Sequence, residues 1–208
     1  MNENDKDFIL EKVKRQNENI WEGKITEPKI KEWLNNFEGQ KYDIEIEKSH
    51  ALYLLSQFMY FGLREIKELI KSLYRDNFKY NIVSYIRKSS NDITDRNILN
   101  AKYKSELSCS QFLGIGNPSE SGTHLLYYFR QENKLPRTNF INAHEIFKRS
   151  IVNGNIIRDI KNNKIKRYVF IDDFCGSGEQ GVKYSRDIVE EIKAKDNNIE
   201  IYYLQRSR

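Results

Sequence analysis

A length of 208 residues allows one large or two small domains, and a content of 38% hydrophobic and 12% aromatic residues is enough for a buried core. The net charge of +5 is small against 35 basic and 30 acidic residues, so it permits phosphate or nucleic-acid partners without requiring them. The polar first residues, the lack of a long apolar run and the two cysteines exclude a secretory leader, a membrane span and a disulfide framework, and they predict a cytoplasmic protein.

The first half of the chain has helical spacing. Apolar residues recur every three or four positions, and the glycines Gly39 and Gly62 interrupt the pattern. Helices are predicted over 5–19 and 27–38, and a helix pair broken near Gly62, or one long helix, over 49–73. The segment 81–87 fits either a strand or a helix. We therefore expect an α-helical N-terminal region over residues 1–105.

The second half alternates short apolar runs with helical spacing, which is typical of an α/β fold with a parallel sheet. The strands are predicted to begin near Gln111, Thr138, Arg167 and Ile199. Helices are predicted over about 123–133 and 179–195. We expect this α/β domain to cover residues 106–208.

Basic residues are concentrated between positions 143 and 167. They are Lys148, Arg149, Arg158, Lys161, Lys164, Lys166 and Arg167. One interpretation is a solvated helix and turn. The other is a basic surface near the site, able to hold pyrophosphate or a nucleic-acid backbone.

The most informative stretch begins at Tyr168. A short apolar run to Ile171 predicts a buried strand, and the run ends in the carboxylates Asp172 and Asp173. In an open α/β sheet, ligands bind just beyond the carboxyl ends of the strands. Asp172 and Asp173 are therefore candidate site residues.

A glycine-rich turn follows the two carboxylates. Gly176, Ser177 and Gly178 allow the backbone to approach a ligand, and amides at the helix start near Glu179 and Gln180 suit an anion such as phosphate. Carboxylates repel phosphate unless ribose hydroxyls or Mg²⁺ lie between them, and Mg²⁺ prefers one or two carboxylates together with phosphates. The pattern predicts a sugar-phosphate site in which Asp172 and Asp173 contact Mg²⁺ indirectly, through ribose hydroxyls or water.

A second loop repeats this arrangement. Gly116, Ser121 and Gly122 lie between a predicted strand and the start of the helix predicted over 123–133, which again suits an anion. An ordinary strand-to-helix turn explains these residues equally well.

These motifs resemble a known family. The run Val169-Phe170-Ile171-Asp172-Asp173 followed by Ser177-Gly178 resembles the binding motif of type I phosphoribosyltransferases. The longer pattern from Phe170 to Gln180, together with the loop 116–122, resembles the phosphoribosyltransferase-like domains of bacterial conflict and phage-defence systems. The resemblance implies that the helical N-terminal region is followed along the chain by a parallel sheet of phosphoribosyltransferase type.

The resemblance also implies roles for the motif residues. Asp172 and Asp173 would hold the ribose hydroxyls of phosphoribosyl pyrophosphate, the turn 176–180 its 5′-phosphate, and the loop 116–122 its pyrophosphate group. Mg²⁺ would be the cofactor, and the reaction would transfer a phosphoribosyl group to a base or nucleotide. A complete core of this family has further strands, so we expect another chain or a longer product to supply them.

Other interpretations stay open. Residues 176–181 also match the dinucleotide-binding pattern G-x-G-x-x-G, although the acids here precede the glycines instead of following them by about 20 residues. The acids and glycines could also simply cap a helix and turn the chain. Four residues depart from the usual turn of the family, namely Phe174, Cys175, Gly176 and Gln180. A non-catalytic nucleotide-sensing or scaffold module that binds a protein or nucleic acid is therefore the alternative to an enzyme.

Overall fold

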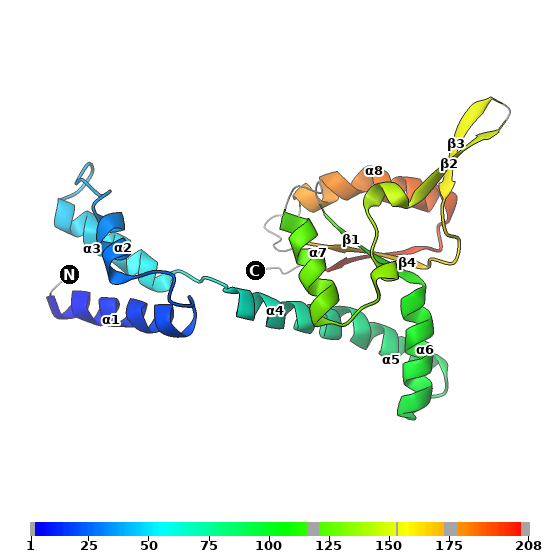
Figure 1. The fold of residues 1–208 in the computed structure, drawn as a ribbon, viewed down its shortest axis with the longest axis horizontal. Coiled ribbons are helices and arrows are strands. Elements are labelled where there is room, and N and C mark those ends of the chain that lie inside the picture. Colours follow the sequence, from blue (N-terminus) through cyan, green and yellow to red (C-terminus); the bar gives the residue numbers. More distant parts are fainter. Residues whose placement is uncertain (1–2, 116–120, 153, 173–178, 205–208) are drawn as a thin grey trace. The chain divides into compact units, whose positions relative to one another are not determined.

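The computed structural model describes residues 3–115, 121–152, 154–172 and 179–204, and it divides the chain into two units, Met1–Ile66 and Lys67–Arg208 (Figure 1). This division falls inside the region that the sequence predicts to be helical. The helices that follow residue 66 therefore belong to the same unit as the sheet. Within the described residues, no helix combines the length and the apolarity that a membrane span requires.

Unit 1, as far as the structure describes it, contains α1 (Glu3–Asn19), α2 (Glu27–Leu34), α3 (Ile44–Gln57) and the first residues of α4 (Leu63–Ser72). The predicted helices are confirmed here, and the pair is indeed interrupted near Gly62. The core of the unit gathers the apolar positions of the helical pattern around a tryptophan that solvent barely reaches. Its buried members are Ile9, Val13, Trp21, Ile30 and Leu52.

The turn between α2 and α3 depends on Gly39. Its backbone φ of +77° is one that residues with a side chain rarely adopt. A Cβ at this position would also lie 3.2 Å from backbone atoms of Tyr42 and Ile44. The carboxylate of Glu47 accepts hydrogen bonds from the backbone N–H groups of Gly39, Lys41 and Tyr42. The glycine and this carboxylate together close the loop.

Unit 2 begins with a helical run. After α4 the chain continues through the π-helical segment η1 (Leu73–Lys79) into α5 (Tyr80–Ser89), and α6 (Arg96–Ser108) follows. The ambiguous residues 81–87 are therefore helical. Asp95 caps α6, because its side chain accepts hydrogen bonds from the N–H groups of Asn97 and Ile98.

The sheet of unit 2 is parallel. In the described residues its order is β1 (Ser110–Gly114), β4 (Arg167–Ile171) and β5 (Glu200–Leu204), so β4 is the central strand. Helix α7 (Ser121–Glu132) follows β1, and α8 (Glu179–Lys195) follows β4. This confirms the predicted α/β architecture with a parallel sheet and the strands predicted near Gln111, Arg167 and Ile199.

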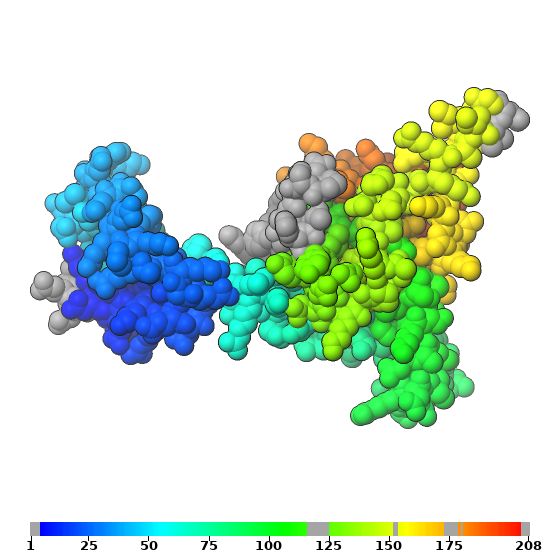
Figure 2. Space-filling view, viewed as in Figure 1, coloured from blue at the N-terminus to red at the C-terminus, as the bar shows by residue number. Residues whose placement is uncertain are grey.

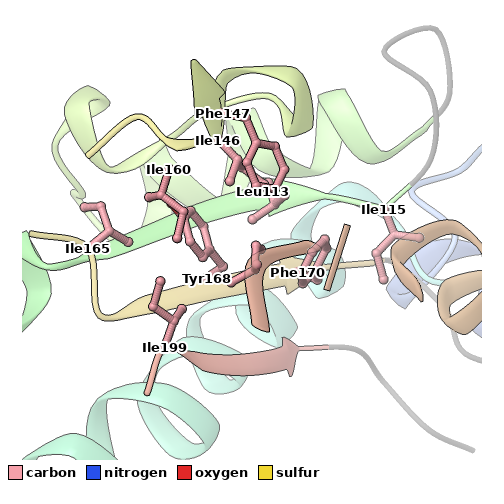
Figure 3. Packing of buried hydrophobic residues seen from close by; sticks show 10 residues of the cluster. Leu113, Ile115, Ile146, Phe147, Ile160, Ile165, Tyr168, Phe170 and Ile199 are labelled. Atoms are coloured by element: carbon pink, nitrogen blue, oxygen red, sulfur yellow. The ribbon is translucent and has the colours of Figure 1, made fainter. Parts of the chain in front are cut away.

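One face of the sheet packs against α8. Leu113 and Phe170 lie side by side on this face, in a buried cluster that includes Ile192 of α8. The cluster also takes side chains from the segments before β2, β4 and β5, such as Ile146, Ile165 and Ile199 (Figure 3). The apolar run of β4 is buried completely, as its lack of polar residues predicts.

The opposite face carries aromatic side chains. Phe112 is fully buried, and its ring centroid lies 5.1 Å from that of Phe78 in η1 and 5.5 Å from that of Phe129 in α7. Phe140 stacks on Phe112 at 5.3 Å. The helical run and α7 therefore cover this face of the sheet, and α8 covers the other.

The prediction of a strand near Thr138 is wrong. The chain forms a short 3₁₀ turn, η2 (Arg137–Asn139), and only a single parallel bridge joins Phe140 to Phe112. The side chain of Asn139 donates hydrogen bonds to the carbonyl oxygens of Leu107 and Ser110, which holds the turn beside β1. These long-range contacts outweigh the extended propensity of the segment.

The basic segment 143–167 also differs from the predicted helix and turn. After the short turn η3 (Ala143–Glu145), it forms an antiparallel hairpin of β2 (Phe147–Val152) and β3 (Asn155–Ile160). Gly154 lies between the strands with φ +80°. The sequence Asn153-Gly154 between two isoleucine-containing runs is a strong signal for such a hairpin, and the prediction of a helix and turn did not include it.

Candidate functional site

The carboxyl ends of β1, β4 and β5 meet at one edge of the sheet, because the strands are parallel. Backbone pairing continues one residue past the strands at this edge. The N–H of Ile115 donates to the carbonyl oxygen of Ile171 at 3.1 Å, and the N–H of Asp172 donates to that of Leu204 at 3.1 Å. The chain is thus held in register up to the residues that begin both connecting segments.

Asp172 lies directly at this edge. It follows four residues of β4, Tyr168 to Ile171, that solvent barely reaches, and it is itself partly exposed. The carboxylate therefore marks the point at which the buried central strand reaches solvent. This is the position at which open α/β sheets bind their ligands.

The start of α8 is anchored to the sheet. The hydroxyl of Ser185, a buried residue in the second turn of α8, donates to the carbonyl oxygen of Gly181 at 2.7 Å and lies 2.6 Å from the hydroxyl of Tyr203 in β5. The Tyr203 ring stacks on Phe170 of β4 at 5.3 Å. These contacts fix the first turns of α8 relative to the two strands.

Helix α7 is anchored in a comparable way. It contacts both β1 and β4, and its Phe129 is fully buried against Phe112. Each of the adjacent strands β1 and β4 is therefore followed by a helix that packs firmly on the sheet and begins after the same edge. Helix N-termini at a strand edge carry amides suited to anions.

The predicted site residues are distributed over this edge as follows. Asp172 and the exposed Glu179 are described with their side chains, at the end of β4 and the first residue of α8. Ser121 and Gly122 begin α7, and Gln180 lies in the first turn of α8. Asp173, Gly116, Gly176, Ser177 and Gly178 lie outside the described residues. The assigned roles of all these residues stay predictions.

Asp172 places a carboxylate at this edge. In the residues that the structure describes, no group of three or more histidine, cysteine, aspartate or glutamate side chains is placed to hold a metal by protein ligands alone. Mg²⁺ usually takes one or two carboxylates and completes its shell with substrate phosphates and water. The partly exposed Asp172 at the carboxyl end of β4 fits that kind of binding.

The other end of β4 carries a buried charge that the sequence did not identify. Arg167 donates 2.6 Å hydrogen bonds to Glu106 of α6 and to Glu200 of β5, and Lys166 donates to Glu106 at 3.2 Å. Burial raises the pKa of Glu106, but the hydrogen bonds from Arg167 and Lys166 outweigh it and hold that pKa below 4.5. Arg167, predicted as part of a basic surface, is neutralised at the edge opposite Asp172.

The chain was compared with known protein families, curated proteins and solved structures, and one family matches it. A family model described as PRTase-CE, a phosphoribosyltransferase-like domain, matches residues 30–205. Neither the search of curated proteins nor that of solved structures returned a match. The matched range contains the whole sheet, both helices that follow its strands, and Asp172.

Proposed function

Because the chain belongs to the PRTase-CE family, we propose that the edge of the sheet at Asp172 binds phosphoribosyl pyrophosphate or a related nucleotide. The observation that carries this proposal is the place of Asp172. It directly follows the buried central strand, at the end of the sheet after which both anchored helices begin, inside the matched range. A carboxylate for sugar hydroxyls and helix amides for phosphates are the groups that such a ligand requires.

In this proposal Asp172 and Asp173 accept hydrogen bonds from the ribose hydroxyls. The turn 176–180 binds the 5′-phosphate through backbone amides, and Gly116, Ser121 and Gly122 bind the pyrophosphate group. Mg²⁺, when bound, supplies positive charge that balances the pyrophosphate, and Asp172 and Asp173 hold it through hydroxyls or water. The buried strand and the anchored α8 keep Asp172 and the first turn of α8 in a fixed relation.

If the protein is an enzyme, the reaction is phosphoribosyl transfer. The bond between ribose C1 and a pyrophosphate oxygen breaks, and pyrophosphate leaves with the bonding electrons. A nitrogen of a base or nucleotide forms the new bond to C1 and releases its proton to the pyrophosphate or to water. Positive charge develops on the sugar and negative charge on the leaving group. Preorganised amides at the strand edge stabilise the departing charge. The likeness to conflict-system domains supports a role in bacterial antiviral defence.

A non-catalytic sensor or scaffold is the second candidate. The sequence of the turn departs from the usual pattern of the family at Phe174, Cys175, Gly176 and Gln180. In unit 1, the side chains of Ile46, Tyr53 and Leu54 on α3 are exposed. They lie on one side of the helix, because Ile46 and Tyr53 are two turns apart and Leu54 is next to Tyr53. An apolar strip of this kind suits a partner protein. In this case nucleotide binding at Asp172 would regulate an interaction instead of supporting a reaction.

Calorimetry tests the binding proposal. Phosphoribosyl pyrophosphate with Mg²⁺ should bind the wild type, and removal of Mg²⁺ by a chelator should abolish or strongly weaken the binding. Asp172→Asn combined with Asp173→Asn should weaken it at least about tenfold, which corresponds to about 1.4 kcal/mol. Asp187→Asn is the matched control, because Asp187 is an exposed acid on α8, and it should bind as the wild type does.

A wild type that binds neither phosphoribosyl pyrophosphate nor a nucleotide contradicts the proposal. Pyrophosphate release then separates the two candidates. Release in the presence of a base or nucleotide, lost in the double variant, identifies a transferase. Binding of phosphoribosyl pyrophosphate without release of pyrophosphate, whichever base or nucleotide is supplied, identifies a sensor.

A further inference from the structure

The hairpin of β2 and β3 has a surface that the proposed phosphoribosyl site does not use. Figure 2 shows it as a narrow yellow arm that stands out from the rest of unit 2. At its base, Phe147 and Ile160 are opposite each other and are buried in the core cluster. Further along, the pairs are Arg149 with Arg158 and then Ile151 with Ile156. These alternate pairs share one face of the hairpin, because side chains alternate between faces along a strand.

The base of the hairpin is held firmly by α8. Arg158 forms an ion pair with Glu191 at 3.1 Å, and its guanidinium lies 4.7 Å from the centre of the Phe147 ring. Asp159 pairs with Lys195 at 3.3 Å. Side chains of both signs on β3 are therefore satisfied by α8, and the hairpin leaves the unit in a defined direction.

The charges that remain on the arm are positive. Lys148, Arg149 and Lys161 are exposed, and within the described residues they form no ion pair. Arg149 is directly opposite Arg158, but Glu191 of α8 balances the charge of Arg158. Arg149 and Lys148 are therefore the cations on the two strands that can attract a partner that carries phosphates.

The far end of the arm is apolar. The side chains of Ile151 and Ile156 are 76% and 71% exposed although they face each other across the hairpin. Burial of both in a partner would remove apolar surface from water. Asn155 and Gly154, which are also exposed, lie beyond them near the turn. The arm therefore combines cations along its length with an aliphatic pair next to an amide at its end.

We propose that this hairpin is a nucleic-acid-binding arm. Arg149, on the face of the isoleucine pair, and Lys148, on the opposite face, contact backbone phosphates, and Ile151 and Ile156 contact sugars or the faces of bases. A two-stranded ribbon fits the major groove of a duplex, and aliphatic side chains are used as wedges against base steps. The exposed Asn155 favours nucleic acid over a lipid bilayer, because an amide can bond base edges but is costly to bury in hydrocarbon.

Fluorescence anisotropy with short labelled oligonucleotides tests the proposal on the full chain. Single-stranded and duplex DNA and RNA are the four probes, each titrated between about 50 and 200 mM salt. The wild type should bind at least one of them with an affinity that falls as salt rises. Lys148→Gln with Arg149→Gln should reduce the slope of log affinity against log salt by about 0.9 per charge on a duplex, or about 0.7 on a single strand.

Lys88→Gln with Lys104→Gln is the matched control. These lysines are exposed on α5 and α6, and the change removes the same charge from the same unit. The control should leave the slope unchanged. A second variant, Ile151→Thr with Ile156→Thr, keeps β-branched side chains and should weaken binding several-fold with an unchanged slope. Hydrogen exchange of the β2 and β3 amides verifies that each hairpin variant is folded.

Three outcomes overturn the proposal. The first is that the wild type binds none of the four probes at about 50 mM salt. The second is that a folded charge variant has the same affinity and slope as the control variant. The third is that vesicles containing phosphatidylserine bind through the isoleucine pair while the oligonucleotides do not bind. None of these measurements contains phosphoribosyl pyrophosphate, so the result is independent of the test of the phosphoribosyl site.

Discussion

Arg167 occupies the first position of the central strand, where its side chain is only 7% exposed. A guanidinium in such a place requires partners that satisfy it, because an unpaired buried charge is costly. Glu106 and Glu200 provide them with hydrogen bonds of 2.6 Å each. The residue joins α6, β4 and β5 at the edge of the sheet opposite Asp172, and its role is therefore structural.

We expect Arg167→Met to destabilise unit 2 by about 2 to 3 kcal/mol, because it removes two charge-assisted hydrogen bonds and leaves Glu106 partly buried. Lys166→Met is the matched control. Lys166 bonds to the same carboxylate but is 59% exposed, so its loss should cost less than about 1 kcal/mol. Hydrogen exchange of the β4 and β5 amides measures this difference. Tryptophan fluorescence would not report it, because both tryptophans lie in unit 1.

The same comparison should depend on pH. The pKa of Glu106 is lowered in the folded state, so its contribution is present above the ordinary value of 4.5 and is lost as the pH falls through the lower folded value. The gap between Arg167→Met and Lys166→Met should therefore shrink below pH 4.5. Equal stabilities of the two variants at neutral pH would contradict a structural role for Arg167.

At the scale of the elements, the aromatic face of the sheet links pieces of chain that are distant in sequence. Phe112 of β1 contacts Phe78 of η1, Phe129 of α7 and Phe140 after η2. Edge-to-face and stacked rings at these separations add to the free energy of area burial. This layer places the helical run and α7 on one face of the sheet and so positions the start of α7 at the candidate site.

Phe112→Ala should destabilise unit 2 by about 3 to 5 kcal/mol, because the cavity would lie between several rings that cannot all move inward. Tyr85→Ala on α5 removes a comparable ring that is 66% exposed, and it should change the free energy of unfolding by less than about 0.5 kcal/mol. Urea denaturation followed by circular dichroism, together with hydrogen exchange in β1, measures both. A cost for Phe112→Ala no larger than that of the control would show that the aromatic layer is loosely packed.

At the scale of the whole molecule, the family match joins the two units. It begins at residue 30 in α2 of unit 1 and continues to residue 205, past the end of β5. The helices α2 and α3 are therefore part of the family's pattern and not a separate addition. The described residues of the site, in contrast, all belong to unit 2.

The proposed ligand should stabilise unit 2 by linkage. At a free concentration of about 100 times its dissociation constant, phosphoribosyl pyrophosphate with Mg²⁺ should raise the free energy of unfolding by about 2.7 kcal/mol. Slower hydrogen exchange in β1, β4 and β5 would reveal it. The effect should disappear without Mg²⁺ and in the Asp172→Asn, Asp173→Asn variant. Stabilisation that persists in that variant would place the ligand elsewhere.

Local patterns in the sequence were sufficient for much of the fold. The apolar run into Asp172 predicted the buried central strand, and the helical spacing after Glu179 predicted α8, because strand and helix periodicities are written in neighbouring residues. The position of the carboxylate at the edge of the sheet followed from that order of elements. The family resemblance rested on the same residues.

Tertiary structure decided what depends on distant partners. Arg167 finds its carboxylates 61 and 33 residues away, so its sequence neighbours could not distinguish a buried ion pair from a basic surface. Asn139 holds its turn through carbonyl groups about 30 residues earlier, which overrode the predicted strand. The exposure of Ile151 and Ile156 likewise depends on how α8 anchors the hairpin. Register and packing bring such groups together, and neither can be read from adjacent residues.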